Sequence, residues 1–313
     1  MTTGGEDLLE RVRATGLLPA DADVLVLLSG GRDSVCLLDV AVALGCAVRA
    51  LHVNYGLREG ADEDEAHCRA LCARLRVELA VHRARRPDDA QGNLQAWARE
   101  VRYTQAASEA GDGAIAVAHT ASDQAETILY RLAASPGRRA LLGMEPRAGR
   151  IVRPLLGITR EQTGAWCRAR GLLWGDDPSN DTDAYARGRV RARLLPALEA
   201  VDPRAAANVV RTAELLREEA AVLDVVVDTA LAGGDRIARE ELAGLPRALA
   251  RLVVRRLAEA ATGGLCARAA SRLDDVLALG DAGALDVGDG ARAVVEGGVV
   301  RFEATPPLHE RGR

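Results

Sequence analysis

The segment SGGRDS at residues 29–34 has the clearest chemical potential in the chain. It follows the apolar run from Val24 to Leu28 and precedes an apolar, helix-like stretch. A loop between a buried strand and a helix N-terminus binds anions, because backbone N–H groups and the helix dipole both favour negative charge there. Gly30 and Gly31 let phosphate oxygens approach the backbone, and Asp33 is suited to hold Mg²⁺ beside phosphates. The segment therefore predicts a nucleotide phosphate site.

The chain contains no lysine, so each of its 41 basic residues is arginine. A Walker loop, which requires Gly-Lys-Ser/Thr, is thereby excluded. The segment instead resembles the SGGxDS pyrophosphate loop of the N-type ATP pyrophosphatases, which cut ATP between its α and β phosphates and adenylate a carbonyl oxygen. The structural alternative is a plain strand-turn-helix connection with a serine N-cap.

A pair of acids follows in the segment AHTASDQAET, residues 118–127. Thr120 or Ser122 could cap a helix on which Asp123 and Glu126, spaced i,i+3, share a face. Opposite a phosphate loop, one carboxylate would support Mg²⁺ and another would bind or deprotonate an amine. Ordinary first-turn acids, which the helix dipole favours, are the alternative.

Two histidines lie at comparable positions. His119 precedes Asp123 and is expected to contact a phosphate or an adenylate, the alternative being a buried structural histidine. His52 begins the segment HVNYGLR, residues 52–58, which is expected to meet the nucleotide base and ribose. Polar residues that satisfy a strand end are the alternative there.

Arginines alternate in the stretch RGRVRAR, residues 187–193, after the Pro-containing turn WGDDPSN at 174–180. On a helix, Arg187 and Arg191 share one face and Arg189 and Arg193 share another, with Leu194 and Leu195 anchoring the segment. Such a comb suits phosphates, whereas a solvated helix face is the alternative. A second stripe, at i, i+4 and i+8, consists of Arg247, Arg251 and Arg255.

The elements that position these groups alternate between strand-like and helix-like segments from residue 24 to about 118. The expected strands cover 24–28, 47–53, 77–82 and 114–118, and the expected helices run to residue 44 and over 61–76 and 93–110. Apolar strands separated by amphipathic helices predict an α/β fold with a doubly wound parallel sheet. Ligands bind at the carboxyl ends of such strands, so the loops at 29–34, 52–58 and 119–126 should converge on one crevice.

The pattern changes near residue 200, where we expect a boundary between a catalytic domain, 1–200, and a smaller, mainly helical domain, 201–313. Helical patterns cover 204–232, 239–261 and 267–279. Short β segments at 284–287, 291–296 and 299–303 follow, with Gly-rich turns between them.

Composition is that of a globular protein, with 48% apolar and 27% charged residues. No stretch approaches the roughly 18 apolar residues of a membrane span, and the N-terminus lacks the features of a signal peptide, so a cytoplasmic location without membrane contact is expected. The six cysteines include no Cys-x-x-Cys and are expected to be reduced and mostly buried. The net charge of −4 does not indicate nucleic-acid binding, although arginine can be concentrated locally.

Together these segments resemble the bacterial tRNA(Ile)-lysidine synthetases. The resemblance rests on the phosphate loop, HVNYGLR, AHTASDQAET, AREVRY at 98–103, RPLL at 153–156 and the block from DPSN to LLP, so it covers about residues 24 to 200. The sequence departs from the common pattern at Tyr55, Ser122 and Gly188, and in the loop 134–139. It is also short for the family, which suggests one C-terminal domain where longer members have two.

The resemblance implies an enzyme that uses ATP and Mg²⁺ to join free L-lysine to C2 of the wobble cytidine of an isoleucine tRNA with a CAU anticodon, as a possible homodimer. It implies ATP contacts from Ser29, Gly30, Gly31, Arg32, Asp33, Ser34 and His52. It implies catalytic roles for Asp33, His119, Asp123 and Glu126, with Mg²⁺ on Asp33 and Asp123. The tRNA would meet Arg187, Arg189, Arg191, Arg193, Arg247, Arg251 and Arg255.

Three alternatives stay open from the sequence. A tRNA 2-thiolation enzyme shares the loop but usually carries paired Cys-x-x-Cys motifs, which are absent. A GMP-synthetase-like amination enzyme needs a glutaminase domain, for which the chain has no room. A catalytically silent RNA-binding relative would be expected to lose Asp33, His119 and Asp123, which are all present.

Overall fold

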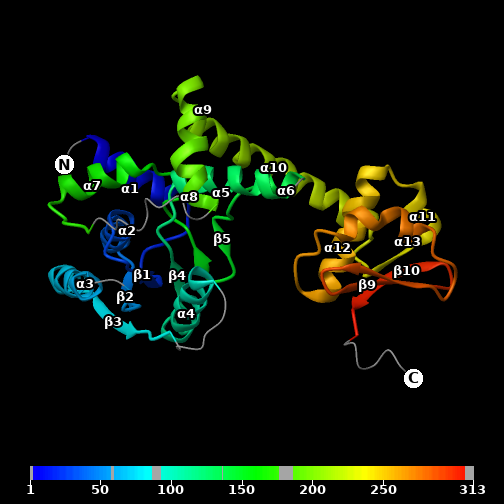
Figure 1. The fold of residues 1–313 in the computed structure, drawn as a ribbon, viewed down its shortest axis with the longest axis horizontal. Coiled ribbons are helices and arrows are strands. Elements are labelled where there is room, and N and C mark those ends of the chain that lie inside the picture. Colours follow the sequence, from blue (N-terminus) through cyan, green and yellow to red (C-terminus); the bar gives the residue numbers. More distant parts are fainter. Residues whose placement is uncertain (1–2, 58–59, 87–92, 136, 176–185, 307–313) are drawn as a thin grey trace. The chain divides into compact units, whose positions relative to one another are not determined.

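A computed structural model describes residues 3–57, 60–86, 93–135, 137–175 and 186–306 (Figure 1). The chain divides into two compact units, Met1–Leu216 and Arg217–Arg313. The division falls inside the long helix α10 (Ala205–Ala230), whereas the boundary expected near residue 200 falls just before that helix.

The N-terminal unit contains a six-stranded sheet in the order β3-β2-β1-β4-β6-β5. Its parallel strands are β1 (Asp23–Leu27), β2 (Ala47–Asn54), β3 (Glu78–Arg83), β4 (Ala114–Ala116) and β6 (Ile151–Val152), and the short β5 (Arg147–Ala148) pairs antiparallel with β6. Strand β1 lies between β2 and β4, so the strand order reverses direction beside it. In such sheets this reversal marks the ligand crevice.

Helices cover both faces of the sheet. On one face α1 (Thr3–Ala14), α2 (Arg32–Ala43), α3 (Ala61–Leu75) and α7 (Arg160–Ala169) share a core with Val24 and Val26. On the other, α4 (Leu94–Glu109) packs on Leu25 and Leu27. Successive side chains of a strand point to opposite faces, so an uninterrupted apolar run fills both cores. The predicted doubly wound α/β fold is confirmed.

Helix α5 (Ala121–Ala134), followed by the short α6 (Arg138–Leu141), forms a further layer. It shares a small core with the π-helical turn η2 (Val190–Leu194), α9 (Leu195–Val201) and the start of α10, and it also contacts α8 (Ala186–Arg189). Leu195 is buried in this core, but Leu194 is 39% exposed. Only one of the two expected anchors therefore holds the arginine-rich segment.

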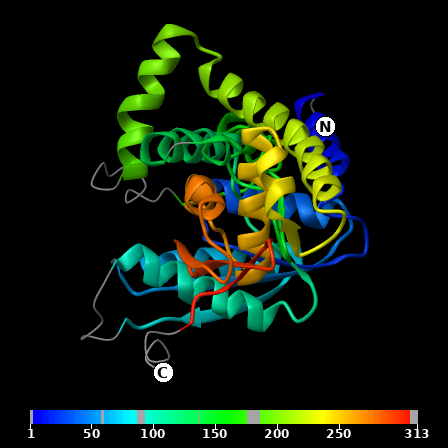
Figure 2. The same cartoon turned by 90° about the vertical axis from the view of Figure 1, so that its right-hand side faces the viewer.

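The C-terminal unit has a four-stranded antiparallel sheet in the order β7-β10-β9-β8. Its strands are β7 (Arg236–Ala238), β8 (Ala284–Gly288), β9 (Ala291–Glu296) and β10 (Val299–Ala304). Helix α12 (Arg247–Thr262) covers β9 and β10, seen as the yellow helix and the orange-to-red strands in Figure 2. The remaining helical pieces are α11 (Arg239–Gly244), the 3₁₀ turn η3 (Ala269–Arg272) and α13 (Leu273–Leu277).

The single helix expected over 239–261 is wrong, because the chain breaks between α11 and α12 and Pro246 is the N-cap of α12. Proline has no backbone N–H and cannot continue a helix from the preceding turn. The short β segments of the tail lie close to where they were expected, but β7 was missed.

None of the described helices is long and apolar enough to cross a membrane. The six cysteines are free, and all except Cys46 are buried, which confirms the expectation that most of the thiols are buried.

Candidate active site

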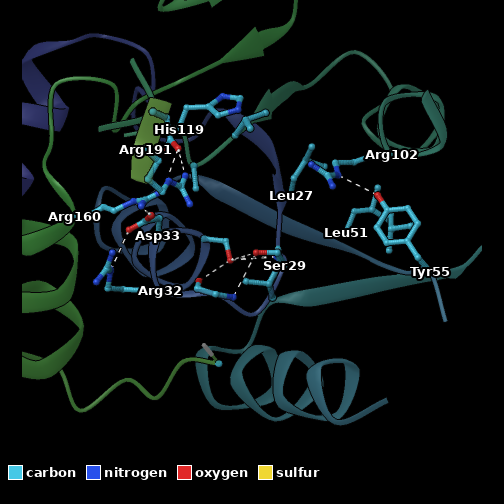
Figure 3. Close-up of a pocket in the computed structure, with 18 residues that line it drawn as sticks. Leu27, Ser29, Arg32, Asp33, Leu51, Tyr55, Arg102, His119, Arg160 and Arg191 are labelled. Carbon is cyan, nitrogen blue, oxygen red and sulfur yellow. Dashed lines mark hydrogen bonds and ion pairs between the residues drawn. The ribbon is translucent and has the colours of Figure 1, made fainter. Parts of the chain in front are cut away.

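A cavity of about 650 Å³ opens at the carboxyl ends of β1, β2 and β4 (Figure 3). Parts of all three loops that were expected to converge line it. The predicted site residues in its wall are Ser29, Gly31, Arg32, Asp33, Ser34, His119, Asp123 and Arg191. Tyr55, Arg102, Arg160 and Gly175 complete the polar lining.

The phosphate loop is held in shape by its own side chains. Gly30 has a φ of 84°, a backbone conformation that favours glycine, and a Cβ there would make a tight contact at 3.3 Å from the Cys68 sulfur. The Ser34 hydroxyl donates to the carbonyl of Gly31 at 2.8 Å and lies 3.0 Å from the hydroxyl of Ser29. Gly31 is the N-cap of α2 and no side chain caps that helix, so the alternative of a serine N-cap is not realised.

Asp33 is fixed from helix α7, which reaches the site from far along the chain. The buried Thr163 hydroxyl donates to Asp33 Oδ1 at 2.5 Å, and Arg160 Nε lies 3.7 Å from Asp33 Oδ2. Sequence reasoning missed both partners, because Arg160 and Thr163 belong to no recognised motif. Their only local signal is the start of a helix behind Thr159, which caps α7.

Asp123 has two roles at once. Its Oδ2 accepts from the backbone N–H of Thr120 at 2.8 Å and from the Thr120 hydroxyl at 2.9 Å, which makes Thr120 the helix cap. Its Oδ1 faces Arg160 Nη2 at 3.3 Å and Arg191 Nη2 at 3.8 Å. Burial raises the pKa of Asp123, but Arg160 and the Thr120 hydrogen bonds outweigh burial and hold the pKa below its usual value. Arg160 thus lies between Asp33 and Asp123, whose carboxylate is ionised at neutral pH.

Glu126 lies behind Asp123, is 2% exposed and does not line the cavity. Both of its oxygens accept from Arg191, at 2.6 Å from Nε and 3.1 Å from Nη2. Arg187 Nη2 donates to the hydroxyl of Thr127 at 3.0 Å. Arg187 and Arg191 thus share the face of their segment that contacts α5, as expected from helical spacing.

Arg189 and Arg193, on the other face of this segment, are exposed. The structure thus brings Arg191, which was expected on the tRNA, into the cavity beside two carboxylates. A π-helical turn at Val190–Leu194 carries this arginine, and such turns are frequent at functional sites. Residues 176–180 of the Pro-containing turn that precedes the segment lie outside the described residues.

His119 is held neutral. Burial lowers its pKa to about 4, and the positive charge of Arg153 acts in the same direction, while Asp123 opposes the shift. Its Nδ1 atom is buried and has no hydrogen-bond partner among the described residues. A neutral imidazole offers one N–H donor to a ligand at pH 7 but no full positive charge.

The segment after β2 contributes to the site unevenly. His52 is buried behind the loop, where its Nδ1 lies 2.9 Å from the carbonyl of Leu28, and it does not line the cavity. Tyr55 does line it, on the wall opposite Asp33, as Figure 3 shows. The Tyr55 hydroxyl donates to the carbonyl of Ala98 at 2.9 Å and accepts from Arg102 Nε at 3.1 Å.

The described residues contain no group of three or more His, Cys, Asp or Glu side chains that could hold a metal ion. Asp33 and Asp123 are two carboxylates that line the same cavity beside the phosphate loop. Mg²⁺ is commonly held by one or two carboxylates together with substrate phosphates and water. The donor set therefore fits Mg²⁺ that arrives with a nucleotide.

The basic stripe of the C-terminal unit lies on α12, but acids share its surroundings. Arg247 forms an ion pair with Asp274. Arg251 is exposed and Arg255 is partly buried. The alternative of a solvated face paired with acids therefore holds for Arg247.

The comparisons place these features in a known family. Residues 8–198 match the PP-loop domain family. The chain is 36% identical over 263 residues to a tRNA(Ile)-lysidine synthase from Gloeobacter violaceus, in a match that covers 80% of this chain and 81% of that protein. It is 41% identical over 239 residues to one from Salinispora arenicola, covering 71% and 70%.

A longer relative, a tRNA(Ile)-lysidine synthase from Thermus thermophilus, is 39% identical over 259 residues, which are 79% of this chain and 50% of that protein. A U34-tRNA thiolase from Methanococcus maripaludis superposes with a TM-score of 0.57 at 18% identity, over 68% of this chain and 78% of that one, so the two share a fold. With its phosphate loop, its acidic pair and relatives of this similarity, the chain belongs to the tRNA(Ile)-lysidine synthase family of PP-loop proteins.

Proposed function

We propose that the protein joins free L-lysine to C2 of the wobble cytidine of a CAU-anticodon isoleucine tRNA, consuming ATP and releasing AMP and pyrophosphate. The observation that carries the proposal is the single cavity in which the phosphate loop faces Asp123, with Arg160 between Asp33 and Asp123. Family membership supplies the substrates, and the cavity contains side chains suited to both halves of the reaction.

In the first half, the C2 oxygen of cytidine attacks the α-phosphate and pyrophosphate leaves. Backbone N–H groups of the loop and the hydroxyls of Ser29 and Ser34 would bind the departing pyrophosphate. Arg160 would neutralise part of its charge, and His119 would donate a hydrogen bond as a neutral imidazole. Mg²⁺ held by Asp33 and Asp123 would stabilise the negative charge that develops on the leaving group.

In the second half, the lysine amine attacks C2 and expels AMP. An amine with a pKa of about 10.4 in water is protonated at pH 7 and must first lose its proton. Asp123 is the better placed acceptor, because its Oδ1 faces the cavity. Glu126 lies behind Asp123 and is engaged by Arg191, so we assign it to positioning that arginine.

The alternatives receive less support. In the described residues the cysteines form no group of metal-binding size with other Cys, His, Asp or Glu side chains, as an iron–sulfur thiolation enzyme would need. A silent RNA-binding relative has no use for a buried threonine that holds Asp33 in place.

An Asp33→Ala variant tests the phosphate site. Pyrophosphate release should be abolished while tRNA affinity stays within about twofold, because the proposed task of Asp33 lies in phosphate chemistry and not in RNA contact. Asp112→Ala removes an exposed turn carboxylate from the same unit and should change neither quantity. Loss of tRNA affinity with intact pyrophosphate release would contradict the assignment.

We further propose that the C-terminal unit and the exposed arginines near α9 contact the tRNA backbone. Replacing Arg247, Arg251 and Arg255 with alanine should weaken tRNA binding. Each lost phosphate contact should reduce the slope of log affinity against log salt by about 0.9. Arg236→Ala, which removes an exposed arginine paired with Asp235 in the same unit, is the control. An unchanged slope in the triple variant would leave α12 a scaffold.

A further inference from the structure

A second cavity, of about 510 Å³, begins at the carboxyl end of β3 and extends along α4. Its lining includes His82, Arg83, Arg85, Trp97, Glu100 and Gln105. Strand β3 is parallel to β2, so this cavity opens at the same edge of the sheet as the phosphate loop. We infer that it binds an unstacked nucleobase of the substrate RNA, next to the nucleotide that reacts in the first cavity. The inference rests on the proposed RNA substrate and adds a site for a neighbouring nucleotide.

An aromatic pair joins the two cavities. The rings of Tyr55 and Trp97 meet edge to face, with centroids 5.8 Å apart and planes at 65°. Tyr55 lines the first cavity and Trp97 lines the second. Trp97 is only partly buried, although a tryptophan at the fourth position of a sheet-covering helix would normally be used in the core. Half-exposed aromatic rings are the platforms on which proteins stack unpaired bases of any sequence.

The charges at the rim suit the phosphates that flank such a base. Glu65, whose pKa is lowered to about 2 mainly by its hydrogen bond with Arg83, holds Arg83 Nε at 2.9 Å. The Arg83 side chain nevertheless remains 68% exposed, so it is oriented and still accessible. Arg85 is exposed and has no ion pair with any carboxylate of the described chain. Guanidinium groups of this kind bind phosphate oxygens through paired N–H donors.

The side of the cavity formed by α4 supplies groups for a base edge. The carboxylate of Glu100 accepts hydrogen bonds, and the amide of Gln105 both donates and accepts. The volume falls within the range of pockets that take a ligand of nucleotide size, roughly 300–1,000 Å³. A single strand that runs from the first cavity past the Tyr55–Trp97 pair brings the neighbours of the wobble base to the second cavity. The second cavity is therefore placed to receive one of them.

Trp97→Ala tests the stacking directly. With a fluorescent anticodon stem-loop RNA and the full-length protein, the affinity of the variant should fall about 5- to 150-fold, the range that corresponds to removal of one base-stacking aromatic ring. Trp97→Phe keeps a ring and should retain affinity within about threefold. The fluorescence of 2-aminopurine placed beside the wobble position should be quenched by the wild type and by Trp97→Phe but not by Trp97→Ala.

Arg85→Ala provides an independent arm that does not disturb the aromatic pair. It should weaken RNA binding and lower the salt slope by about 0.7, the value for a single strand, whereas Arg211→Ala, an exposed arginine on α10 paired with Glu214, should not. Unchanged RNA affinity together with unchanged 2-aminopurine quenching in a folded Trp97→Ala variant would overturn the inference. If Trp97→Ala does not fold, an unchanged salt slope in Arg85→Ala would overturn it. A wild type that binds the RNA through Trp97 but forms no lysidine would instead contradict the proposed function alone.

Discussion

The protonation of His119 should be visible as a pH dependence of stability. Its pKa is about 4 in the folded chain and about 6.5 in an unfolded one. The unfolded state therefore binds more protons between these values, so the contribution of His119 to stability is complete above about pH 6.5 and is lost as the pH falls towards 4. At 1.36 kcal/mol per pKa unit the full loss is about 3 kcal/mol, of which about 2 kcal/mol falls between pH 7 and pH 5.

Urea unfolding of the wild type and of His119→Gln at pH 7, 6 and 5 measures this contribution of His119 to the unfolding free energy. Glutamine cannot titrate, so the unfolding free energy of the wild type minus that of His119→Gln should fall by about 2 kcal/mol from pH 7 to pH 5. The contributions of the other titrating groups are the same in both proteins and cancel in this difference. In proton NMR the imidazole resonance of His119 is the one that is missing from the spectrum of His119→Gln. In the wild type this resonance should titrate near pH 4. Bound ATP should raise that midpoint, because phosphate charge favours the imidazolium.

A midpoint near 6.5 in the free protein, or an unfolding free-energy difference that does not depend on pH, would refute the reasoning. Either result would mean that His119 is solvated and acts as an ordinary surface histidine. A titration midpoint that does not change when ATP binds would still agree with a buried His119, but it would contradict the placement of His119 at the phosphate site.

Asp39→Ala should destabilise the N-terminal unit by about 3–5 kcal/mol in urea unfolding, because the buried Asp39 forms an ion pair with Arg170, accepts from Trp166 Nε1 at 2.8 Å and so joins α2 to α7; a loss below 1 kcal/mol would show that the two helices dock without it. Gly143→Ala should cost at least about 2 kcal/mol by the same measurement, since Gly143 has a φ of 66° and a Cβ would lie 2.6 Å from Gln124 Oε1; full stability would contradict this close approach. Glu126→Gln should chiefly raise the KM for lysine in steady-state kinetics, and unchanged lysine kinetics would assign Glu126 a structural role.

Much of the N-terminal unit could be predicted because its signals are local. The uninterrupted apolar run at 24–28 is buried on both sides, which only a covered parallel strand allows, and this places SGGRDS at the head of a helix. The convergence of the loops then follows from the common direction of the strands. In the C-terminal unit the local signal was misread, since Pro246 breaks the expected helix.

The composition of the site was less predictable, because its contacts span large separations in sequence. Thr163 meets Asp33 across 130 residues, and no pattern around Thr163 distinguishes it from other helix residues. The sequence identified Arg191 as one of the alternating arginines at 187–193. It could not show that the Arg191 side chain points towards Glu126 and away from solvent. Long-range pairs of this kind depend on how helices dock, which local propensity does not encode.

The most direct test of the account is product formation with purified protein and tRNA transcripts. Isoleucine tRNA with a CAU anticodon, ATP, Mg²⁺ and lysine should yield pyrophosphate, AMP and a nucleoside with the mass of lysidine at the wobble position. Omitting lysine should remove the lysidine, and a methionine tRNA with the same anticodon should give none. Lysidine formed equally on both tRNAs would contradict the specificity, and pyrophosphate release without any lysidine in the presence of lysine would contradict the central claim.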